Sequence, residues 1–202
     1  MRTITMLALA LALAVGLASA QETQHTIDID IVQVGQWWVV DVEWAGDEPF
    51  SRETSTFDGR CSVPSDYYAW GHGELLVFPV GAQTVSTEHC GQLTWEADAD
   101  GVLVVRGKAG TDGRFTYEGA DGSVGNGHYY GAETGYDPSM GTIWFVLDFI
   151  LDEVTGVEGL EFVAGGTVLQ SLVNDIEALL GGTEPLIQLG QGTMSFLPAA
   201  TD

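Results

Sequence analysis

Basic residues are scarce in this chain, and their scarcity excludes whole classes of partner. The sequence holds six Lys and Arg residues against 29 Asp and Glu residues, which gives a formal net charge of −23. Proteins bind nucleic acids and anionic membranes through Lys and Arg side chains that neutralise phosphates. We therefore expect no nucleic-acid partner. The acidity itself fits either a solubilising surface, for example in a saline medium, or a surface that binds cations.

Cysteine is rarer still, because Cys61 and Cys90 are the only two. Two cysteines are too few for a structural zinc site unless histidines complete it, and His89 is the histidine beside them. An isolated pair in an exported protein is typical of a disulfide. We therefore predict a disulfide between Cys61 and Cys90.

A long apolar run without charge occurs at the N-terminus of the sequence. Arg2, the apolar segment from Met6 to Leu17 and the sequence Ala18-Ser19-Ala20 match the three regions of a secretory signal peptide. The apolar segment has about a dozen residues, fewer than the roughly 20 that a membrane-spanning helix needs. We expect a signal peptide over residues 1–20 and a single secreted β-rich domain over residues 21–202. The expected location is secreted or periplasmic/extracellular, with no membrane span after cleavage.

Several catalytic motifs are also missing. No serine lies in a Gly-x-Ser-x-Gly sequence, so the nucleophile elbow of many hydrolases is excluded. No two histidines have the close spacing that places two imidazoles on one metal. The Gly-rich stretch 119–127 is not followed by a helical pattern, which argues against a phosphate-binding loop. We expect no cofactor.

The chain does contain many strand and turn signals. Three Asp-Gly pairs, at residues 100–101, 112–113 and 121–122, divide the stretch from Cys90 to Gly131 into short runs rich in Val, Thr, Phe, Tyr and Trp. Asp-Gly is a strong hairpin signal, so this stretch predicts an antiparallel meander. Further strands are predicted from period-two alternation and β-branched content: Thr26–Val34 and Trp37–Trp44 as a hairpin turning at Gly35-Gln36, Tyr67–Val80, Thr84–Ala97, Thr142–Leu151 (where a short helix fits nearly as well), Leu160–Val163 and Leu186–Phe196.

Two other segments complete the predicted architecture. Residues 45–64 have little apolar periodicity and are expected to form a long surface loop that ends near Cys61. An amphipathic helix is predicted over Val168–Leu180, with Thr167 as N-cap and Gly181-Gly182 after its end. The fold class is therefore all-β and mainly antiparallel. We expect a single β-barrel or sandwich of about eight or more strands with this helix packed on it.

The run from Gly71 to Gly131 resembles secreted bacterial β-barrels related to allene oxide cyclase and dirigent proteins. The similarity lies in His72-Gly73, in Ala99-Asp100-Gly101, and in the Gly-Thr-Asp-Gly-Arg-Phe sequence of residues 110–115. The inserted Asp112 and the predicted C-terminal helix depart from that pattern. The resemblance implies an eight-stranded antiparallel barrel with an apolar interior. It implies no activity, because no motif allows catalytic residues to be transferred to this chain.

Only a few polar residues are candidates for a metal-binding or catalytic role. Asp98 and Asp100 are candidate calcium ligands, since Glu96, Asp98 and Asp100 place oxygens at alternate positions before Gly101. Position twelve of an EF-hand loop would be Glu but is Gly107, so the EF-hand is excluded. On a strand His72 and Glu74 would share one face, and His128 and Tyr130 would share another. His72, Glu74 and His128 are therefore candidate acid–base residues if their face lines a pocket.

Aromatic residues point more clearly to binding. Adjacent pairs on a strand must place one ring on each face of the sheet, so one ring of each pair is free to contact a ligand. The candidate ligand-binding residues are Trp37, Trp38, Trp70, Tyr67, Tyr68, Tyr129 and Tyr130. These patterns favour a protein that binds a small apolar or carbohydrate ligand or a cell-surface partner. The alternatives are a cyclase or isomerase with its active site in a barrel cavity, and a structural envelope or matrix protein that binds calcium weakly.

Overall fold

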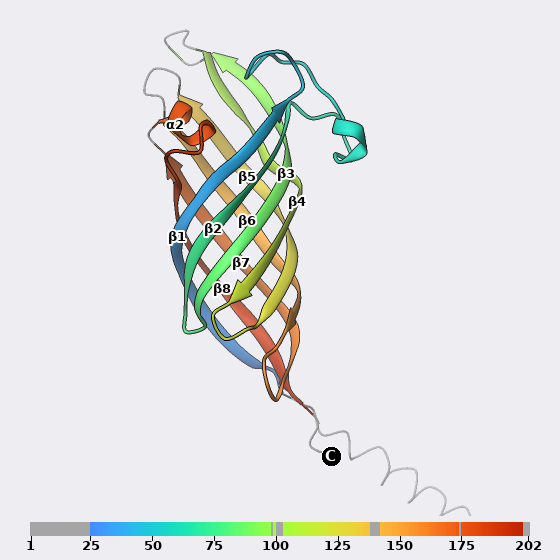
Figure 1. Ribbon diagram of the computed structural model, residues 1–202, viewed down its shortest axis with the longest axis vertical. Coiled ribbons are helices and arrows are strands. Elements are labelled where there is room, and N and C mark those ends of the chain that lie inside the picture. The colour runs from blue at the N-terminus through green and yellow to red at the C-terminus, as the bar shows by residue number, and fades with distance from the viewer. Residues whose placement is uncertain (1–24, 98, 100–102, 138–141, 174, 200–202) are drawn as a thin grey trace, which may run out of the picture.

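The protein is a closed, eight-stranded antiparallel β-barrel (Figure 1). The computed structural model describes residues 25–97, 99, 103–137, 142–173 and 175–199. The strands follow one another around the barrel in chain order, and β1 pairs with β8 to close it. Closure pairs both edges of every strand, so no sheet edge is left open. The all-β class is confirmed, and the barrel is the form observed.

The eight strands are long, and the described ranges also contain two short helices. The helices are the 3₁₀ turn η1 (Phe57–Gly59) and α2 (Ile176–Leu180). The strands are β1 (Ile27–Trp44), β2 (Tyr67–Phe78), β3 (Gly81–Ala97), β4 (Leu103–Gly119), β5 (Val124–Asp137), β6 (Thr142–Thr155), β7 (Leu160–Val173) and β8 (Leu186–Pro198). The predicted strands Thr142–Leu151 and Leu186–Phe196 are confirmed as parts of β6 and β8. Residues 45–64 form the predicted loop, which carries η1.

The core lies inside the barrel because side chains alternate between inside and outside along every strand. In the middle, Phe115, Phe149 and Leu169 pack together, and the rings of Tyr129 and Phe149 stack with centroids 4.5 Å apart. Ile176 and Leu179 of α2 pack with Trp37 at one end, the upper end in Figure 1. A further apolar cluster fills the other end, with the buried side chains of Ile31, Val77, Met194 and Phe196.

The predicted hairpin at Gly35-Gln36 is wrong, because β1 is one continuous strand of 18 residues. Gly35 pairs with Leu75 on one side and with Gln188 on the other. A Cβ at this position would overlap the carbonyl oxygen of Glu74. Glycine is therefore present here because a neighbouring strand approaches closely, which is the other common use of glycine within a strand.

The predicted helix Val168–Leu180 is also wrong over most of its length. The first part, through Val173, belongs to β7, and only Ile176–Leu180 is helical. Leu169 and Val173 point into the barrel, whereas Val168 and Leu172 are exposed on its outside. Apolar residues on both faces of β7 imitate the 3.6-residue period of a helix. The observed N-cap is Asp175, whose carboxylate accepts hydrogen bonds from the backbone N–H groups of Glu177 and Ala178, both at 3.0 Å.

The Asp-Gly pairs play different roles. Asp121-Gly122 forms the turn between β4 and β5, with Gly122 at a φ of 84°. Asp112-Gly113 does not separate two strands but lies within β4, where the register with β5 shifts between Gly107 and Gly113. The Asp112 carboxylate accepts hydrogen bonds from the backbone N–H and the hydroxyl of Ser62 in the β1–β2 loop. Asp100-Gly101 lies outside the described residues, as does the expected signal peptide.

Candidate functional site

The spaces among the described residues include a cavity inside the barrel and a large groove on its outside. The interior cavity measures about 50 Å³ and is lined mainly by apolar side chains, together with Gln33, Thr167 and Gln188. A cavity that holds benzene measures about 150 Å³. The interior therefore has room for a few water molecules but not for a sugar ring or a substrate of similar size.

Polar side chains inside the barrel hydrogen-bond to one another. The indole N–H of Trp37 donates to the Thr87 hydroxyl at 2.7 Å, and Nδ1 of His89 lies 2.7 Å from the Tyr129 hydroxyl. Burial lowers the pKa of His89 to about 4 and raises the pKa of Tyr129 well above its usual value. Both groups are therefore neutral near pH 7. His89 was not among the predicted site residues, although its even spacing from Val85 and Thr87 on β3 indicates the same inward face.

The second space is a groove of about 790 Å³ on the outside of the barrel. We call the outward face of β2 to β5, with the edge of β6 beside it, the groove wall. Three of the predicted site residues, Tyr68, Trp70 and His72, lie along the groove on β2. The groove is lined by Val40, Arg60, Tyr68, Trp70, Gly71, His72, Ser86, Thr87, Glu88, Arg114, Phe115, Thr116, Asn126, Gly127, His128 and Asp152.

The adjacent aromatic pairs divide between the interior and the outside, as alternation requires. Trp37, Tyr67 and Tyr129 are buried in the core. Their neighbours Trp38, Tyr68 and Tyr130 have the opposite orientation. Trp70 is exposed on the groove wall, with 45 % of its surface accessible. The inward rings support the fold, so only the outward rings remain as candidates for ligand contact.

Three outward rings of β2 form one continuous strip along the groove. Tyr68, Trp70 and His72 occupy successive outward positions, which are about 7 Å apart on a strand. The ring of Trp38 on β1 stacks on His72 with centroids 5.5 Å apart and planes inclined by 18°. A ligand that contacts the whole strip therefore extends over about 14 Å.

Two rows of polar side chains cross the strands from this strip. In the first row, Trp70 pairs with Glu88, Glu88 with Arg114, and Arg114 with His128. In the second row, the register sequence is His72, Ser86, Thr116 and Asn126. These positions come from four strands and have no common sequence motif. The barrel's register alone brings them together.

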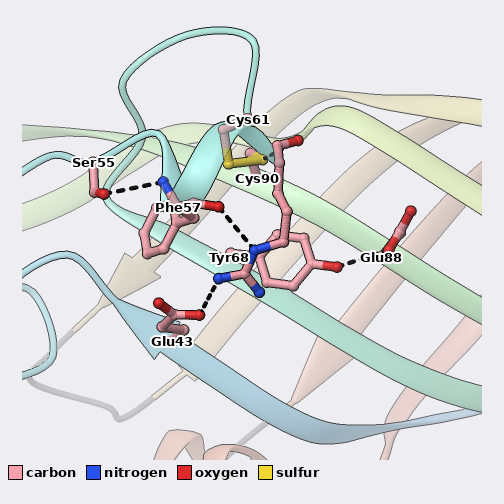
Figure 2. Close-up of polar contacts among 8 residues, drawn as sticks. Glu43, Ser55, Phe57, Cys61, Tyr68, Glu88 and Cys90 are labelled. Carbon is pink, nitrogen blue, oxygen red and sulfur yellow. Dashed lines mark hydrogen bonds and ion pairs between the residues drawn. A yellow bond between two sulfur atoms is a disulfide. The ribbon is translucent and has the colours of Figure 1, made fainter.

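The β1–β2 loop covers one end of the groove, and the disulfide attaches it there. Cys61 is bonded to Cys90 of β3, as predicted (Figure 2). Beside the disulfide, the Arg60 guanidinium lies 4.2 Å from the centroid of the Tyr68 ring. Arg60 also forms an ion pair with Glu43, and its Nε donates to the carbonyl of Phe57 at 2.9 Å. These contacts keep Arg60 at the groove although its backbone belongs to a loop.

Tyr68 and Glu88 connect the ring strip to the polar rows. The Tyr68 hydroxyl donates a hydrogen bond to a carboxylate oxygen of Glu88 at 2.7 Å (Figure 2). Partial burial, followed by this hydrogen bond, raises the pKa of Tyr68. The phenol therefore stays protonated and fixes the position of Glu88, leaving other lone pairs of that carboxylate available.

The groove is almost balanced in charge within a very acidic chain. Arg60 and Arg114 face Glu88 and Asp152, so two formal positive charges meet two negative ones. Nδ1 of His128 lies 2.9 Å from a carboxylate oxygen of Asp152, and both side chains are about half exposed. Among the described residues, the side chain of Arg114 makes no hydrogen bond or ion pair, so its guanidinium is available to a ligand. A neutral, hydrogen-bonding ligand suits this balance.

The candidate acid–base residues lie outside the barrel. His72 and His128 line the same groove, whereas Glu74, the next outward residue of β2, is not part of its lining. None of the three lines the interior cavity. A catalytic site inside the barrel could therefore not use them; it would have to use inward polar groups such as Gln33, Gln188 and the His89–Tyr129 pair.

The candidate calcium ligands Asp98 and Asp100 lie outside the described residues. Within those residues, no group of three or more His, Cys, Asp or Glu side chains is arranged to hold a metal ion. No helix in the described ranges is long and apolar enough to cross a membrane.

An eight-stranded barrel with an apolar interior is the architecture implied by the resemblance to allene oxide cyclase and dirigent proteins, but an architecture does not establish a relationship. Protein-family models, curated proteins and solved structures all give no match to this chain.

Proposed function

We propose that this protein binds a neutral oligosaccharide or glycan chain in the groove on the outside of the barrel. The observation that carries the proposal is the exposed ring of Trp70, placed between Tyr68 and His72 and beside two rows of hydrogen-bonding side chains. Sugars combine apolar C–H faces with a periphery of hydroxyl groups. Aromatic rings suit the faces, and carboxylate, amide and guanidinium groups suit the hydroxyls.

The polarity of the groove favours a sugar over an apolar ligand. An apolar molecule would cover Arg114 and Glu88 without replacing the hydrogen bonds that they make to water, and burying charges in this way is costly. Hydroxyl groups can donate to Glu88 and accept from Arg114. The length of the ring strip favours several sugar rings over one.

An exported binding protein agrees with the disulfide, because disulfides persist mainly in oxidising compartments. We propose secretion or a periplasmic/extracellular location on this ground together with the N-terminal sequence. In either location the groove would be accessible to glycans on a cell surface or in the surrounding medium.

The test is a titration of the protein with a panel of neutral oligosaccharides, namely cello-, xylo-, malto- and chitohexaose, followed by calorimetry. We expect at least one of them to bind and Trp70→Ala to weaken that binding about 10-fold or more, since a well-placed aromatic contact is worth about 1–2 kcal/mol. Tyr130→Ala is the matched control, because Tyr130 is 47 % exposed but does not line the groove.

Two outcomes would contradict the proposal. One is that no oligosaccharide binds at millimolar concentration. The other is that Tyr130→Ala weakens binding as much as Trp70→Ala, which would locate the contact outside the groove. Far-UV circular dichroism and thermal melting of both variants check that the barrel is intact.

A further inference from the structure

The outside of the barrel carries a second surface of different character. We call it the apolar wall and define it by Val32 and Val34 of β1, Phe78 of β2, Leu172 of β7, and Ile187 and Leu189 of β8. Between 41 and 59 % of each of these side chains is exposed. Aliphatic and aromatic side chains of this size are usually covered when several of them lie together.

These six side chains form one continuous patch. Val34 pairs with Leu189, Val32 pairs with Phe78, and Leu172 pairs with Ile187 across neighbouring strands. Directly opposed residues on one face of a sheet have Cβ atoms about 5 Å apart. Six half-exposed side chains at this spacing make a patch of several hundred Å², comparable with the roughly 300–600 Å² of the largest patch on a typical monomer.

Charge is absent from the middle of this patch, although the chain has 29 acidic residues. The outward positions of β7 from Gly166 to Leu172, and of β8 from Ile187 to Ser195, carry no charged side chain. The polar residues there are uncharged, and Gln170 and Gln191 are exposed among the apolar side chains. A glutamine amide both donates and accepts hydrogen bonds, so it is complementary to another glutamine amide.

The distribution of charge indicates which kind of molecule covers the apolar wall. Two copies with a net charge of −23 repel one another on most approaches, but the middle of the apolar wall carries no acid, and Asp28 and Asp30 of β1 lie at its margin. A cationic protein would find no carboxylates to pair with in the middle of the patch. A bilayer would need apolar residues around the barrel, whereas Glu88, Arg114 and His128 are directed outward from β3 to β5.

We propose that two copies of this chain associate through their apolar walls to form a symmetric dimer. The same patch serves both copies, which is the geometry of a two-fold interface. Because all edges of the barrel are paired, the contact is made by side chains of two sheet faces rather than by strand addition. A standard interface buries about 800 Å² on each partner, so the patch with its surrounding glutamines and threonines is close to that size.

In the dimer, the groove of each copy lies on the side of its barrel away from the interface. The groove is centred on β3 and β4, whereas the apolar wall is centred on β8 and β1, on the other side of the strand order. Association therefore leaves both grooves open. If the groove binds glycans, as proposed above, the dimer is bivalent for a surface that displays many of them. The bivalency rests on the proposed function, but the dimer does not.

Analytical ultracentrifugation of the chain without residues 1–20, from 0.5 to 100 μM, tests the proposal. We expect a species of twice the monomer mass whose dissociation constant falls by several-fold between 20 mM and 500 mM NaCl, because salt screens the repulsion between the acidic surfaces. Leu189→Glu should raise the dissociation constant at least 100-fold, since it places two like charges in the middle of the interface.

Val124→Glu is the matched control, because Val124 is 46 % exposed on β5, across the barrel from β1. It should leave the dissociation constant unchanged. Leu189→Gln adds no charge and provides a second variant should Leu189→Glu fold poorly; we expect it to weaken association about 10-fold. Circular dichroism reports the fold of each variant.

Three results would overturn the proposal. The wild-type protein could be a monomer at 100 μM in 500 mM NaCl, Val124→Glu could dissociate the dimer as effectively as Leu189→Glu, or the wild-type protein could sediment with phosphatidylcholine vesicles. The last result would assign the apolar wall to lipid. Oligosaccharide binding by Leu189→Glu, measured with the panel above, shows separately whether the groove functions.

Discussion

The groove wall and the apolar wall are built on the same barrel but differ in the charge and aromatic content of their outward residues. Both walls send apolar side chains inward, where residues from both, such as Phe115 and Leu169, share one core cluster. Outward, the groove wall alternates rings, carboxylates and guanidinium groups, whereas β7 and β8 of the apolar wall have no charged residue in the middle of their outward faces. The difference shows that the inward residues specify the barrel and leave the outward residues free for two separate tasks.

The largest effect is expected from a single methyl group added at Gly71, which lies on the inward face of β2 behind the groove wall. A Cβ at Gly71 would overlap the Trp37 ring and the carbonyl oxygen of Trp38. Because backbone cannot move aside cheaply, Gly71→Ala should lower the free energy of unfolding by about 3 kcal/mol or more. On β7 of the apolar wall, Gly166→Ala is the matched control, since a Cβ there meets only the carbonyl oxygen of Phe149, at 3.3 Å.

Urea unfolding followed by circular dichroism measures both variants. We expect Gly166→Ala to change the free energy of unfolding by less than about 1 kcal/mol. Equal losses in the two variants would show that the close approach of β1 and β2 at Gly71 is not a special feature of the groove wall.

Removal of the disulfide should weaken binding at the groove wall but leave self-association through the apolar wall unchanged. The Cys61–Cys90 bridge closes 29 residues of chain separation and attaches the Arg60 loop to β3. In the chain-entropy account its loss costs about 3–4 kcal/mol. The double variant Cys61→Ser, Cys90→Ser should therefore melt at lower temperature and bind oligosaccharide more weakly, with no change in self-association. A weakened dimer in this variant, measured by ultracentrifugation at a temperature where it is folded, would contradict the separation of the two walls.

Acidification should affect both walls together, because it acts on the interior that they share. The folded pKa of His89 is about 4, below the usual 6.5, since burial disfavours its charged form. Between these values the unfolded chain binds a proton that the folded chain does not. The stabilisation is complete above pH 6.5 and is lost as the pH falls towards 4.

Urea unfolding at pH 7 and pH 5 measures this loss. The wild-type protein should lose up to about 2 kcal/mol more than His89→Gln, which keeps a hydrogen-bonding partner for Tyr129 but does not titrate. If both proteins lose the same free energy, the pH dependence arises from the carboxylates and not from His89.

The smallest effect is expected at the rim of the groove wall. His128 and Asp152 form a half-exposed pair, and such pairs contribute about 0–1 kcal/mol. Asp152→Asn should change the unfolding free energy by no more than about 0.5 kcal/mol. It should reduce oligosaccharide affinity only slightly, in contrast to Trp70→Ala. A larger loss of affinity in Asp152→Asn than in Trp70→Ala would move the centre of the site from the ring strip to the far rim.

Local sequence patterns predicted the parts of the fold that depend on neighbouring residues. The alternation and β-branched content of Thr142–Leu151 identified a strand, and an isolated cysteine pair identified the disulfide. Alternation also placed one ring of each aromatic pair outward. The same reasoning failed over Val168–Val173, because the apolar wall places apolar residues on the outward face as well and removes the polar half of the pattern.

The groove could not be predicted because its residues meet only through strand register. His72, Ser86, Thr116 and Asn126 form one row across four strands, and the intervals between them depend on where each turn and bulge falls. One such bulge, at Asp112-Gly113, was interpreted from the sequence as a hairpin turn. A single misplaced residue reverses the direction of every side chain after it. The sequence therefore identified the outward rings but not their polar partners.

Because β1 pairs with β8, the apolar wall can form only after the last strand of the chain has folded into the barrel. The groove wall is made by consecutive strands, so its parts are available early in the chain, whereas the apolar wall joins β1 to β7 and β8 and needs residue 34 beside residue 189. A chain that stops short, or that has not yet closed, has no such surface. Only chains that have completed the barrel would therefore be able to form the proposed dimer.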